Sequence, residues 1–428
     1  MSSQSDRVPI LRQARWRLVL FLGVAAALNY ADRAAMSSVL PAVREDLGLS
    51  DVALGMLGSF FLWSYALCSP FAGSLGDHYS RTRIVIISLV AWSAVTALMG
   101  AATGFPMLLG LRVGLGVTES LFLPAAFALI AQAHDLRTRG RAMSMISIGI
   151  NGGMVLGGAT AGFLAEHYGW RTGFWVFGIA GLILALAGPS FLPASSPQAT
   201  PAGNTAKRPS FGEAVRYLAR VRTYYALLVE STLSGMGMWI FFAWLPLYFR
   251  DTFNLSLAAA GFAGTFMLQV SVVLGVIVGG WVSDRAAARA PHRRMLAYGT
   301  CYLLCAPFLL LFLTQPGFGV VVVAISCFSF LRGVGQANDN PTLCEVVPAQ
   351  FRSTAIGIMN ACATGVGGCG VFIAGYLKAG FGLNAIFACI SGAFVLAGVV
   401  LLLAYRWFVL SDILSARAAE TSDSNNVG

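Results

Sequence analysis

Charged residues are scarce in this chain, and their scarcity excludes an ordinary soluble domain. Asp, Glu, Lys and Arg together make up 11% of the 428 residues, whereas a typical soluble domain contains about 25%. Hydrophobic residues account for 57%. This composition indicates a protein whose surface faces lipid rather than water.

The sequence also lacks the clusters that metal sites, disulfides and nucleotide hydrolysis require. None of the eight cysteines forms a close CxxC or Cys/His cluster, so we interpret them as small apolar fillers. The four histidines fall between apolar runs, which excludes a histidine proton relay at membrane depth. No G-x-x-x-x-G-K-[ST] loop or catalytic triad is present. We therefore predict a protein that is not an enzyme, needs no metal or cofactor and is not driven by ATP.

Long apolar runs dominate what is present. Each has roughly 20 residues, enough to cross a ~30 Å hydrocarbon layer as a helix, and none alternates as membrane-spanning strands do. The runs cover residues 18–40, 53–75, 83–103, 107–131, 142–164, 172–192, 224–248, 257–282, 295–314, 318–343, 354–377 and 384–408. The predicted fold is an all-α membrane protein with twelve transmembrane helices.

The net charge of +10 reflects how the chain is oriented in a membrane rather than a nucleic-acid partner. Of the 28 Lys and Arg residues, 21 fall in segments on the same side as both termini and four in loops on the other side. Positive charge accumulates on the cytoplasmic side of membrane proteins. No cleavable signal peptide is evident. We expect a multi-pass protein of the plasma membrane, the inner membrane of a bacterium, with both termini cytoplasmic.

A polar interruption divides the runs into six and six. PASSPQATPAGNTAKRPS is rich in Pro, Ala, Ser and Thr and is typical of a flexible linker. FGEAVRYLARVR follows it and predicts a short basic amphipathic helix. The predicted organisation is a six-helix bundle over 1–192, a cytoplasmic linker over 193–222, a second six-helix bundle over 223–410 and a cytoplasmic tail over 411–428.

The two halves resemble each other, which predicts an internal duplication. Three motifs recur in the same order at offsets of 207, 220 and 213: GSLGD at 73–77 with GWVSD at 280–284, LRVGLG at 111–116 with LRGVGQ at 331–336, and AGFLAEHYGWRTGF at 161–174 with AGYLKAGFGLNAIF at 374–387. Such repeats indicate a duplicated unit. Two pseudo-symmetric six-helix bundles with a midplane site between them form a transporter architecture.

The first loop motif carries a family resemblance. GSLGDHYSRTR resembles the G-x-L-x-D-x-x-G-R-[RK] loop of the major facilitator superfamily, with Ser80 in place of the usual Gly. We interpret the motif as a conformational latch, in which an acid pairs with basic residues in one state and releases them in another. The alternative is a simple turn followed by basic residues. The latch candidates are Gly73, Asp77 and Arg81, with Asp284 and Arg285 as their second-half counterparts.

Seven charged residues fall inside the apolar runs and away from the outermost residues of each run; a charge costs ~2.5–3.5 kcal/mol at a helix centre. Four form the main candidate site. Asp32 and Arg33 are adjacent in the first run, and Arg112 and Glu119 lie seven residues apart in the fourth. Seven residues are about two helical turns, so Arg112 and Glu119 share one helix face. We expect these groups to face a central cavity.

These residue types suit the joint binding of a proton and an organic anion. A buried carboxyl group favours its neutral form, and a nearby Arg favours the anion. An organic anion that occupies Arg33 or Arg112 would compete for that Arg and promote protonation of Asp32 or Glu119. Arg stays charged and grips carboxylates in a bidentate fork. The alternative is a static buried ion-pair network that only fixes helix packing.

Two motifs narrow the resemblance. NYADR, at 29–33, resembles the first-span NYxDR of the anion:cation symporter family, and RVGLGVTES, at 112–120, resembles its fourth-span R-x-x-x-G-x-x-E. That resemblance implies that Asp32 and Glu119 are the proton sites and that Arg33 and Arg112 hold the anion. Spinster-like lipid transporters share this charge pattern, which leaves an amphipathic lipid as the rival substrate.

Several other residues are candidates for the same cavity. Tyr30 belongs to NYADR, and the polar groups of Tyr65, Asn151 and Asn360 are expected at membrane depth, where they would bind substrate hydroxyls or join helices. In NDNP, at 338–341, the proline disrupts a helix and frees backbone near Asn338 and Asp339. Two further ionisable candidates are Glu230, which either binds a second proton or reaches the membrane interface, and Arg332.

We therefore predict a secondary transporter that alternates access by rocking its two halves and symports a small organic anion, such as a sugar acid, with protons. Sodium coupling stays open because the same carboxylates serve either ion. The alternatives are a Spinster-like transporter of lysolipid and a membrane sensor on the same fold. The protein is expected to bind no nucleic acid and to act as a monomer.

Overall fold

The computed structural model describes residues 4–134, 136–192, 211–290 and 292–425. Within these ranges the elements are helical and no strand occurs. The N-terminal half holds α1 (Gln4–Leu47), α2 (Asp51–His78), α3 (Arg81–Met99), α4 (Phe105–Ser120), α5 (Phe122–Ala133), α6 (Leu136–Tyr168) and α7 (Trp170–Phe191). The remaining elements are α8 (Phe211–Leu218), α9 (Arg222–Phe253), α10 (Leu257–Arg289), α11 (Arg293–Cys305), α12 (Pro307–Leu310), the 3₁₀ turn η1 (Leu311–Thr314), α13 (Phe318–Gln336), α14 (Asp339–Val346), α15 (Ala349–Trp407) and α16 (Val409–Asn425).

Twelve helical segments of the described chain are long and apolar enough to cross a membrane. Eleven continuous stretches meet this criterion, and the longest, Gln350–Trp407, contains two of the segments. Gly382 has a φ of 73°, a left-handed conformation that breaks α15 into two arms. The prediction of an all-helical membrane protein with twelve spans is confirmed. The sequence places the division at 377–384, where Gly382 lies.

The chain packs as two compact units. Unit 1 comprises Met1–Gly203 with Phe242–Phe266, and unit 2 comprises Asn204–Phe241 with Met267–Gly428. The second segment of unit 1 belongs to the predicted second bundle. It groups with unit 1 because Gly261 of α10 lies against the backbone of Gly158 in α6. The predicted domain boundaries therefore stay a prediction, with this segment as the point of difference.

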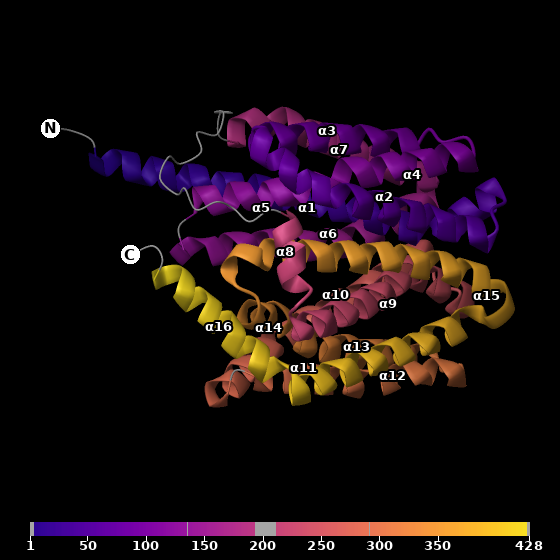
Figure 1. The fold of residues 1–428 in the computed structure, drawn as a ribbon. Helices are drawn as coiled ribbons and strands as arrows, with labels where there is room; N and C mark the ends of the chain where they lie inside the picture. The colour runs from indigo at the N-terminus through magenta and orange to yellow at the C-terminus, as the bar shows by residue number, and fades with distance from the viewer. Residues whose placement is uncertain (1–3, 135, 193–210, 291, 426–428) are drawn as a thin grey trace. The chain divides into compact units, whose positions relative to one another are not determined.

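In unit 1, α1 packs on α6, α2 on α4, and α3 on α7 (Figure 1). Glycines on α6 make the first of these contacts close. A Cβ at Gly153 would collide with the carbonyl oxygen of Ala27, and one at Gly157 with Ala31. Small residues at helix interfaces let backbones approach in this way. The contact holds the middle of α1, which carries Asp32 and Arg33, against a rigid neighbour.

In unit 2, α11 packs on α13 and α15. Aromatic rings form much of the interior, where Phe241 stacks on Phe387 at 4.6 Å and Phe328 meets Phe394 edge to face at 4.9 Å. The Asp412 carboxylate of α16 accepts a 2.7 Å hydrogen bond from the backbone N–H of Thr223. This bond satisfies one of the free N–H groups at the start of α9.

The predicted break at NDNP is present, but it lies before the proline rather than at it. Helix α13 ends at Gln336 and α14 begins at Asp339. Pro341 sits in the first turn of α14, where a residue without an N–H is tolerated because no helical acceptor is required. The break therefore falls at Ala337 and Asn338.

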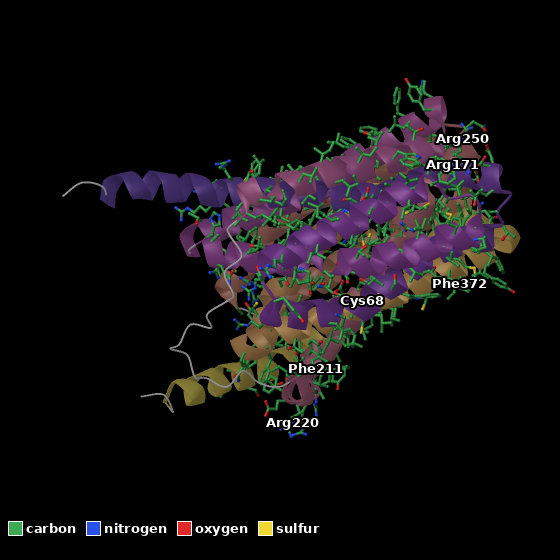
Figure 2. The ribbon with its side chains drawn as sticks, turned by 90° about the horizontal axis from the view of Figure 1, so that it is seen from above. Cys68, Arg171, Phe211, Arg220, Arg250 and Phe372 are labelled. Carbon is green, nitrogen blue, oxygen red and sulfur yellow. The ribbon has the colours of Figure 1, made fainter. Side chains whose placement is uncertain are left out.

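The short helix α8 lies where the sequence predicts an amphipathic segment. Its Ala214 and Leu218 side chains are buried, and Tyr217 stacks on Phe351 at 4.6 Å. Figure 2 shows Phe211 and Arg220 projecting outward near the two ends of this segment. Residues 193–210 of the predicted linker lie outside the described residues.

Candidate functional site

Helices α1 and α4 of unit 1 carry the four predicted charged residues, and α2 and α3 supply hydrogen-bond partners for two of them. Arg33 Nε of α1 donates a 2.7 Å hydrogen bond to Glu119 Oε2 of α4, with the two side chains 3% and 0% exposed. The pair joins residues 86 positions apart in the sequence. Charge-assisted bonds of this length are among the stronger contacts in proteins.

Asp32 has a different partner. Its Oδ2 accepts a 3.0 Å hydrogen bond from the hydroxyl of Thr96 on α3. The side chain is 2% exposed, and its Oδ1 has no hydrogen-bond partner among the described residues. The acid next to Arg33 therefore interacts with a neutral hydroxyl rather than with a cation.

Arg112 of α4 donates from Nε to the backbone carbonyl oxygen of Leu57 on α2, at 2.9 Å. It forms no ion pair with Asp32 or Glu119 within 4.0 Å in the described part of the chain, although its charge acts on both carboxylates. The guanidinium carbon lies 4.6 Å from the centre of the Phe61 ring. Arg112 is thus a buried cation held by a carbonyl and a ring.

Aromatic rings surround Arg33. Its guanidinium carbon lies 4.5 Å from the Tyr30 ring centre, 4.6 Å from that of Tyr65 and 5.2 Å from that of Phe61. The predicted residues Tyr30 and Tyr65 therefore belong to this site. Phe61 contacts both arginines and was not predicted, because a Phe in an apolar run carries no distinguishing signal.

Close packing of α4 on α2 explains how the two arginines share Phe61. A Cβ at Gly116 would collide with Ser64 and with the carbonyl oxygen of Phe61. The glycine therefore lets α4 approach α2 at the depth of the site. Helix α4 ends at Ser120, directly after Glu119, and α5 continues the span from Phe122. Glu119 consequently lies where one helix gives way to the next.

Several buried polar atoms at the site have no hydrogen-bond partner among the described residues. They include Arg33 Nη2, Arg112 Nη1 and Asp32 Oδ1, whereas the side-chain amide of Asn29 is placed to stabilise the Glu119 carboxylate. Most buried polar groups in proteins are hydrogen-bonded. Unpartnered N–H groups from two cations within one dry site have the chemistry to receive an anion, and an unpartnered carboxylate oxygen has the chemistry to receive a proton.

Three other predicted lining residues, Asn151, Asn360 and Asn338, make no contact with this site among the described residues. Asn151 of α6 donates from its amide to the carbonyl oxygen of Ser147 in its own helix, at 2.7 Å. Asn360 is exposed and belongs to unit 2. Asn338 is fully buried in unit 2, where its amide donates to the carbonyl oxygens of Val334 and Gly335. Their roles in substrate binding stay predictions.

The latch residues are described in part. Gly73 and the side chain of Asp77 belong to the segment 72–78, whose surroundings are outside the described part of the structure. Arg81 donates to the carbonyl oxygen of Ala128 at 3.5 Å. In the second half, Asp284 accepts from Arg294 at 3.4 Å, and the Arg285 guanidinium lies 3.6 Å from the Trp281 ring centre.

Arg294, which pairs with two acidic residues near the second-half loop, was not predicted from the sequence. Arg294 also lies 3.4 Å from Glu345 of α14, so it connects the ends of α10, α11 and α14. Nothing separates Arg294 from its basic neighbours in the sequence HRR. Its two acidic contacts are what distinguish it.

The two remaining ionisable predictions lie in unit 2. Glu230 of α9 is 2% exposed and is hydrogen-bonded to the hydroxyls of Tyr298 and Tyr302 on α11. It does not reach a surface of the protein, contrary to the interface alternative. Arg332 is 8% exposed and donates to Gln336 at 2.9 Å.

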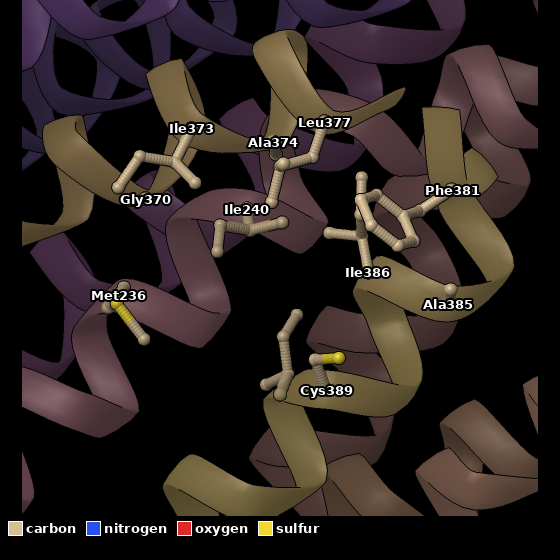
Figure 3. A pocket seen from close by; sticks show the side chains of 11 residues that line it. Met236, Ile240, Gly370, Ile373, Ala374, Leu377, Phe381, Ala385, Ile386 and Cys389 are labelled. Atoms are coloured by element: carbon tan, nitrogen blue, oxygen red, sulfur yellow. The ribbon is translucent and has the colours of Figure 1, made fainter. Parts of the chain in front are cut away.

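A separate cavity of about 300 Å³ lies in unit 2 between α9 and the two arms of α15. Figure 3 shows its apolar lining, which includes Met236, Ile240, Ile373, Phe381 and Cys389. None of the predicted site residues borders it. No group of three His, Cys, Asp or Glu side chains suited to a metal ion occurs among the described residues.

Comparisons with known proteins agree with the fold and the motifs. The sequence model of the Major Facilitator Superfamily matches residues 22–369. The hexuronate transporter of Bacillus subtilis (strain 168) is 26% identical over 92% of this chain and 92% of its own length. The probable galactarate/D-glucarate transporter GudP of the same organism is 27% identical over 63% of this chain. Several curated relatives, GudP among them at 65%, are matched over less than two thirds of their own length.

Among solved structures, a bacterial homolog of the human lysosomal transporter Spinster superposes with a TM-score of 0.74 at 20% identity. The match covers 93% of this chain and 97% of that protein, and at this identity it establishes the fold. The superfamily match spans most of the sequence and includes all four charged residues of the unit 1 site. The chain therefore belongs to the major facilitator superfamily and is a multi-pass membrane transporter rather than an enzyme.

Proposed function

We propose that this protein is a secondary active transporter that carries a small organic anion, a sugar acid or another carboxylate, together with protons. One observation supports the proposal above the others: Arg33 and Arg112, both buried in unit 1, each have a guanidinium nitrogen that is unpartnered among the described residues, and Asp32 beside them has an unpartnered Oδ1. The names of relatives such as the hexuronate transporter favour the same substrate class.

The substrate carboxylate would bind between the two guanidinium groups. Arg112 Nη1 and Arg33 Nη2 are its donors, since both lack a protein partner in the described residues. Arg33 is at the same time the ion-pair partner of Glu119. An incoming anion therefore competes with Glu119 for Arg33, and the competition couples the anion to the state of that acid.

Proton binding follows from this competition. A carboxylate at 0% exposure that loses its cation carries an uncompensated buried charge, which is costly. A proton on Glu119 removes that charge and leaves Arg33 free for the substrate. Asp32 is the second acceptor, because its partner is a neutral hydroxyl rather than a cation, and that hydroxyl can still donate to the carbonyl oxygen of a protonated carboxyl group.

The proposed cycle has a definite charge balance. One proton with one monovalent anion is neutral, and a second proton adds one positive charge, so the membrane potential would assist uptake. Transport runs by alternating access between the two six-helix repeats. The proposed setting is the bacterial inner membrane with both termini in the cytoplasm, as the distribution of Lys and Arg favours.

Uptake of radiolabelled glucuronate into proteoliposomes, with and without a pH gradient that is acid outside, tests the proposal. Wild type should accumulate the label only with the gradient. Glu119→Gln should abolish accumulation and retain counterflow exchange, because Gln mimics the protonated acid. Glu166→Gln, at an exposed carboxylate of α6 in the same unit, is the matched control and should behave as wild type.

Two results would overturn the proposal. The first is no uptake of glucuronate, galactarate or gluconate under any gradient, together with movement of a labelled lysolipid. The second is uptake that follows a sodium gradient at constant pH and ignores a proton gradient without sodium.

A further inference from the structure

Unit 2 holds a buried acid that the proposed anion site does not use. Glu230 is 2% exposed, and the hydroxyls of Tyr298 and Tyr302 are its hydrogen-bond partners. The Tyr302 hydroxyl lies 3.1 Å from Ser234 Oγ. Among the described residues, Glu230 Oε2 has no hydrogen-bond partner and this carboxylate forms no ion pair within 4.0 Å. A buried charge in such a setting is costly unless it is neutralised.

The break between α13 and α14 supplies the other charged groups that act on Glu230. Arg332 precedes the break and Asp339 follows it. The charges of both residues act on Glu230. The guanidinium of Arg332 bonds Gln336 and leaves its Nε unpartnered, while Asp339 leaves its Oδ1 unpartnered. Buried Glu230 thus feels one positive and one negative charge, from Arg332 and from the half-buried Asp339, and forms an ion pair with neither among the described residues.

Part of this arrangement repeats that of unit 1. Arg332 and Asp339 are seven residues apart at the break in their span, as Arg112 and Glu119 are at the α4–α5 break. Both pairs are related by the offset of 220 that aligns LRVGLG with LRGVGQ. Each break therefore carries an arginine and an acid in equivalent positions of the repeat.

The first and third helices of each repeat also supply an acid and a hydroxyl group, although Glu230 lies 198 residues after Asp32 (230 − 32) and not at the repeat offset of 207–220. In unit 1, Asp32 of the first span accepts a hydroxyl hydrogen bond from Thr96 of the third span. In unit 2, Glu230 of the first span of its repeat accepts from Tyr298 and Tyr302 of the third. Each repeat thus supplies the same types of group in the same order along the chain: an acid, a hydroxyl donor, an arginine and a second acid.

The two sites differ in the residue that follows the acid in the first span of each repeat. In unit 1 the residue after Asp32 is Arg33, which pairs with Glu119. In unit 2 the residue after Glu230 is Ser231, whose hydroxyl bonds the carbonyl oxygen of Leu228. The unit 2 site therefore lacks an arginine next to its acid, whereas in unit 1 Arg33 balances the charge of Glu119. It has the acids and hydroxyls of a proton site without the paired arginines of an anion site.

We propose that Glu230 is a second proton-binding site, carried by the second repeat, with Tyr298 and Tyr302 orienting its carboxyl group and Asp339 as a neighbouring acceptor. A proton needs only the unpartnered Oε2 oxygen. A sodium ion would need several oxygen ligands and would meet the positive charge of Arg332, which already acts on this carboxylate. Proton binding here stands on the geometry of unit 2, and only its role in transport rests on the proposed function.

Infrared difference spectroscopy of the full-length protein in lipid, titrated with acid in sodium-free buffer, tests this site without any transport measurement. Wild type should show a protonated-carboxyl band from a dry environment, and Glu230→Gln should remove one component of it. Tyr302→Phe should shift that component, since it deletes one hydrogen-bond donor but keeps the acid. Glu119→Gln should leave the component in place.

A carboxyl band that is unchanged in Glu230→Gln overturns the inference. Loss of the wild-type band on addition of NaCl at constant pH overturns it as well. If Glu230→Gln fails to fold by thermal melting, the Tyr302→Phe shift decides, and an unshifted band overturns the inference. The outcome is independent of the anion proposal. A band lost in Glu230→Gln alongside absent glucuronate uptake would reject the proposed function and keep this site.

Discussion

Arg33 and Glu119 form a buried ion pair across α1 and α4, with 2.7 Å between Nε and Oε2. The pair lies one residue from Asp32, which has no cationic partner within 4.0 Å in the described chain. Replacing a buried ion pair by apolar residues is often neutral or stabilising, so the pair is not explained by stability alone. A role in binding explains both the pair and the unpartnered nitrogen that Arg33 retains.

Lysine cannot replace Arg112 without loss of affinity. The guanidinium uses Nε for the Leu57 carbonyl oxygen and keeps Nη1 for the substrate, whereas an ammonium group lacks this planar fork. We expect Arg112→Lys to raise the KM for glucuronate counterflow about tenfold to a hundredfold, corresponding to the loss of one charged hydrogen bond of ~1.5–3 kcal/mol.

Arg171→Lys is the control for that substitution. Arg171 is 38% exposed and pairs with Asp46 in the same unit, away from the buried charges. It should leave the KM within twofold of wild type. An Arg112→Lys variant with unchanged KM would show that Arg112 does not touch the substrate.

Thr96 holds Asp32 through a single hydroxyl group. Thr96→Val keeps the shape of the side chain and removes the donor, so Asp32 loses the hydrogen bond that it accepts from Thr96. A buried group left unsatisfied costs about 1–3 kcal/mol. We expect a lower Tm for Thr96→Val in detergent and slower gradient-driven uptake, with recovery in Thr96→Ser. Equal Tm values for all three proteins would mean that the bond contributes nothing.

The sequence was sufficient for the membrane fold because the hydrocarbon layer imposes one length on every span. It placed the last division correctly between 377 and 384, where Gly382 breaks α15. It did not anticipate that 242–266 would pack with unit 1. That packing depends on the close approach of α6 and α10 at Gly158 and Gly261. The spacing of glycines on one helix does not show which other helix packs against them.

The charged site was predictable because charge is rare and costly inside a membrane. Asp32, Arg33, Arg112 and Glu119 therefore stood out from their apolar runs and do gather in unit 1. Their pairing was not predictable. Their positions in the sequence place all four at membrane depth but do not show which acid meets which arginine, and the structure pairs Arg33 with Glu119. Thr96, Tyr298 and Tyr302 were missed since neutral hydroxyls are common in spans, and only their contacts reveal a role.

The contact between α1 and α6 should control the geometry of the site. A Cβ at Gly153 would collide with the carbonyl oxygen of Ala27, five residues before Asp32, and backbone cannot move aside cheaply. We expect Gly153→Ala to lower the Tm by several degrees and to reduce glucuronate counterflow at least tenfold.

Gly152 offers a matched control at the adjacent position. A Cβ there meets nothing within 4 Å, and alanine favours a helix over glycine by about 1 kcal/mol. Gly152→Ala should therefore equal or exceed wild type in Tm and keep its counterflow rate. Similar losses in both variants would indicate that helix α6 is sensitive to any substitution rather than to its contact with α1.

A proton site at Glu230 leads to a quantitative prediction about the number of protons coupled to each transported anion. If Glu230 carries a proton through the cycle, Glu230→Gln should lower the number of protons moved per glucuronate by one while uptake still responds to the pH gradient. The reversal potential of proteoliposomes at several fixed pH gradients gives this number directly. Glu119→Gln should abolish gradient-driven uptake altogether, because it acts on the acid that competes with the substrate for Arg33. An unchanged reversal potential in Glu230→Gln would place Glu230 outside the transport cycle even where infrared spectra show that it binds a proton, since a site that stays protonated throughout moves no charge.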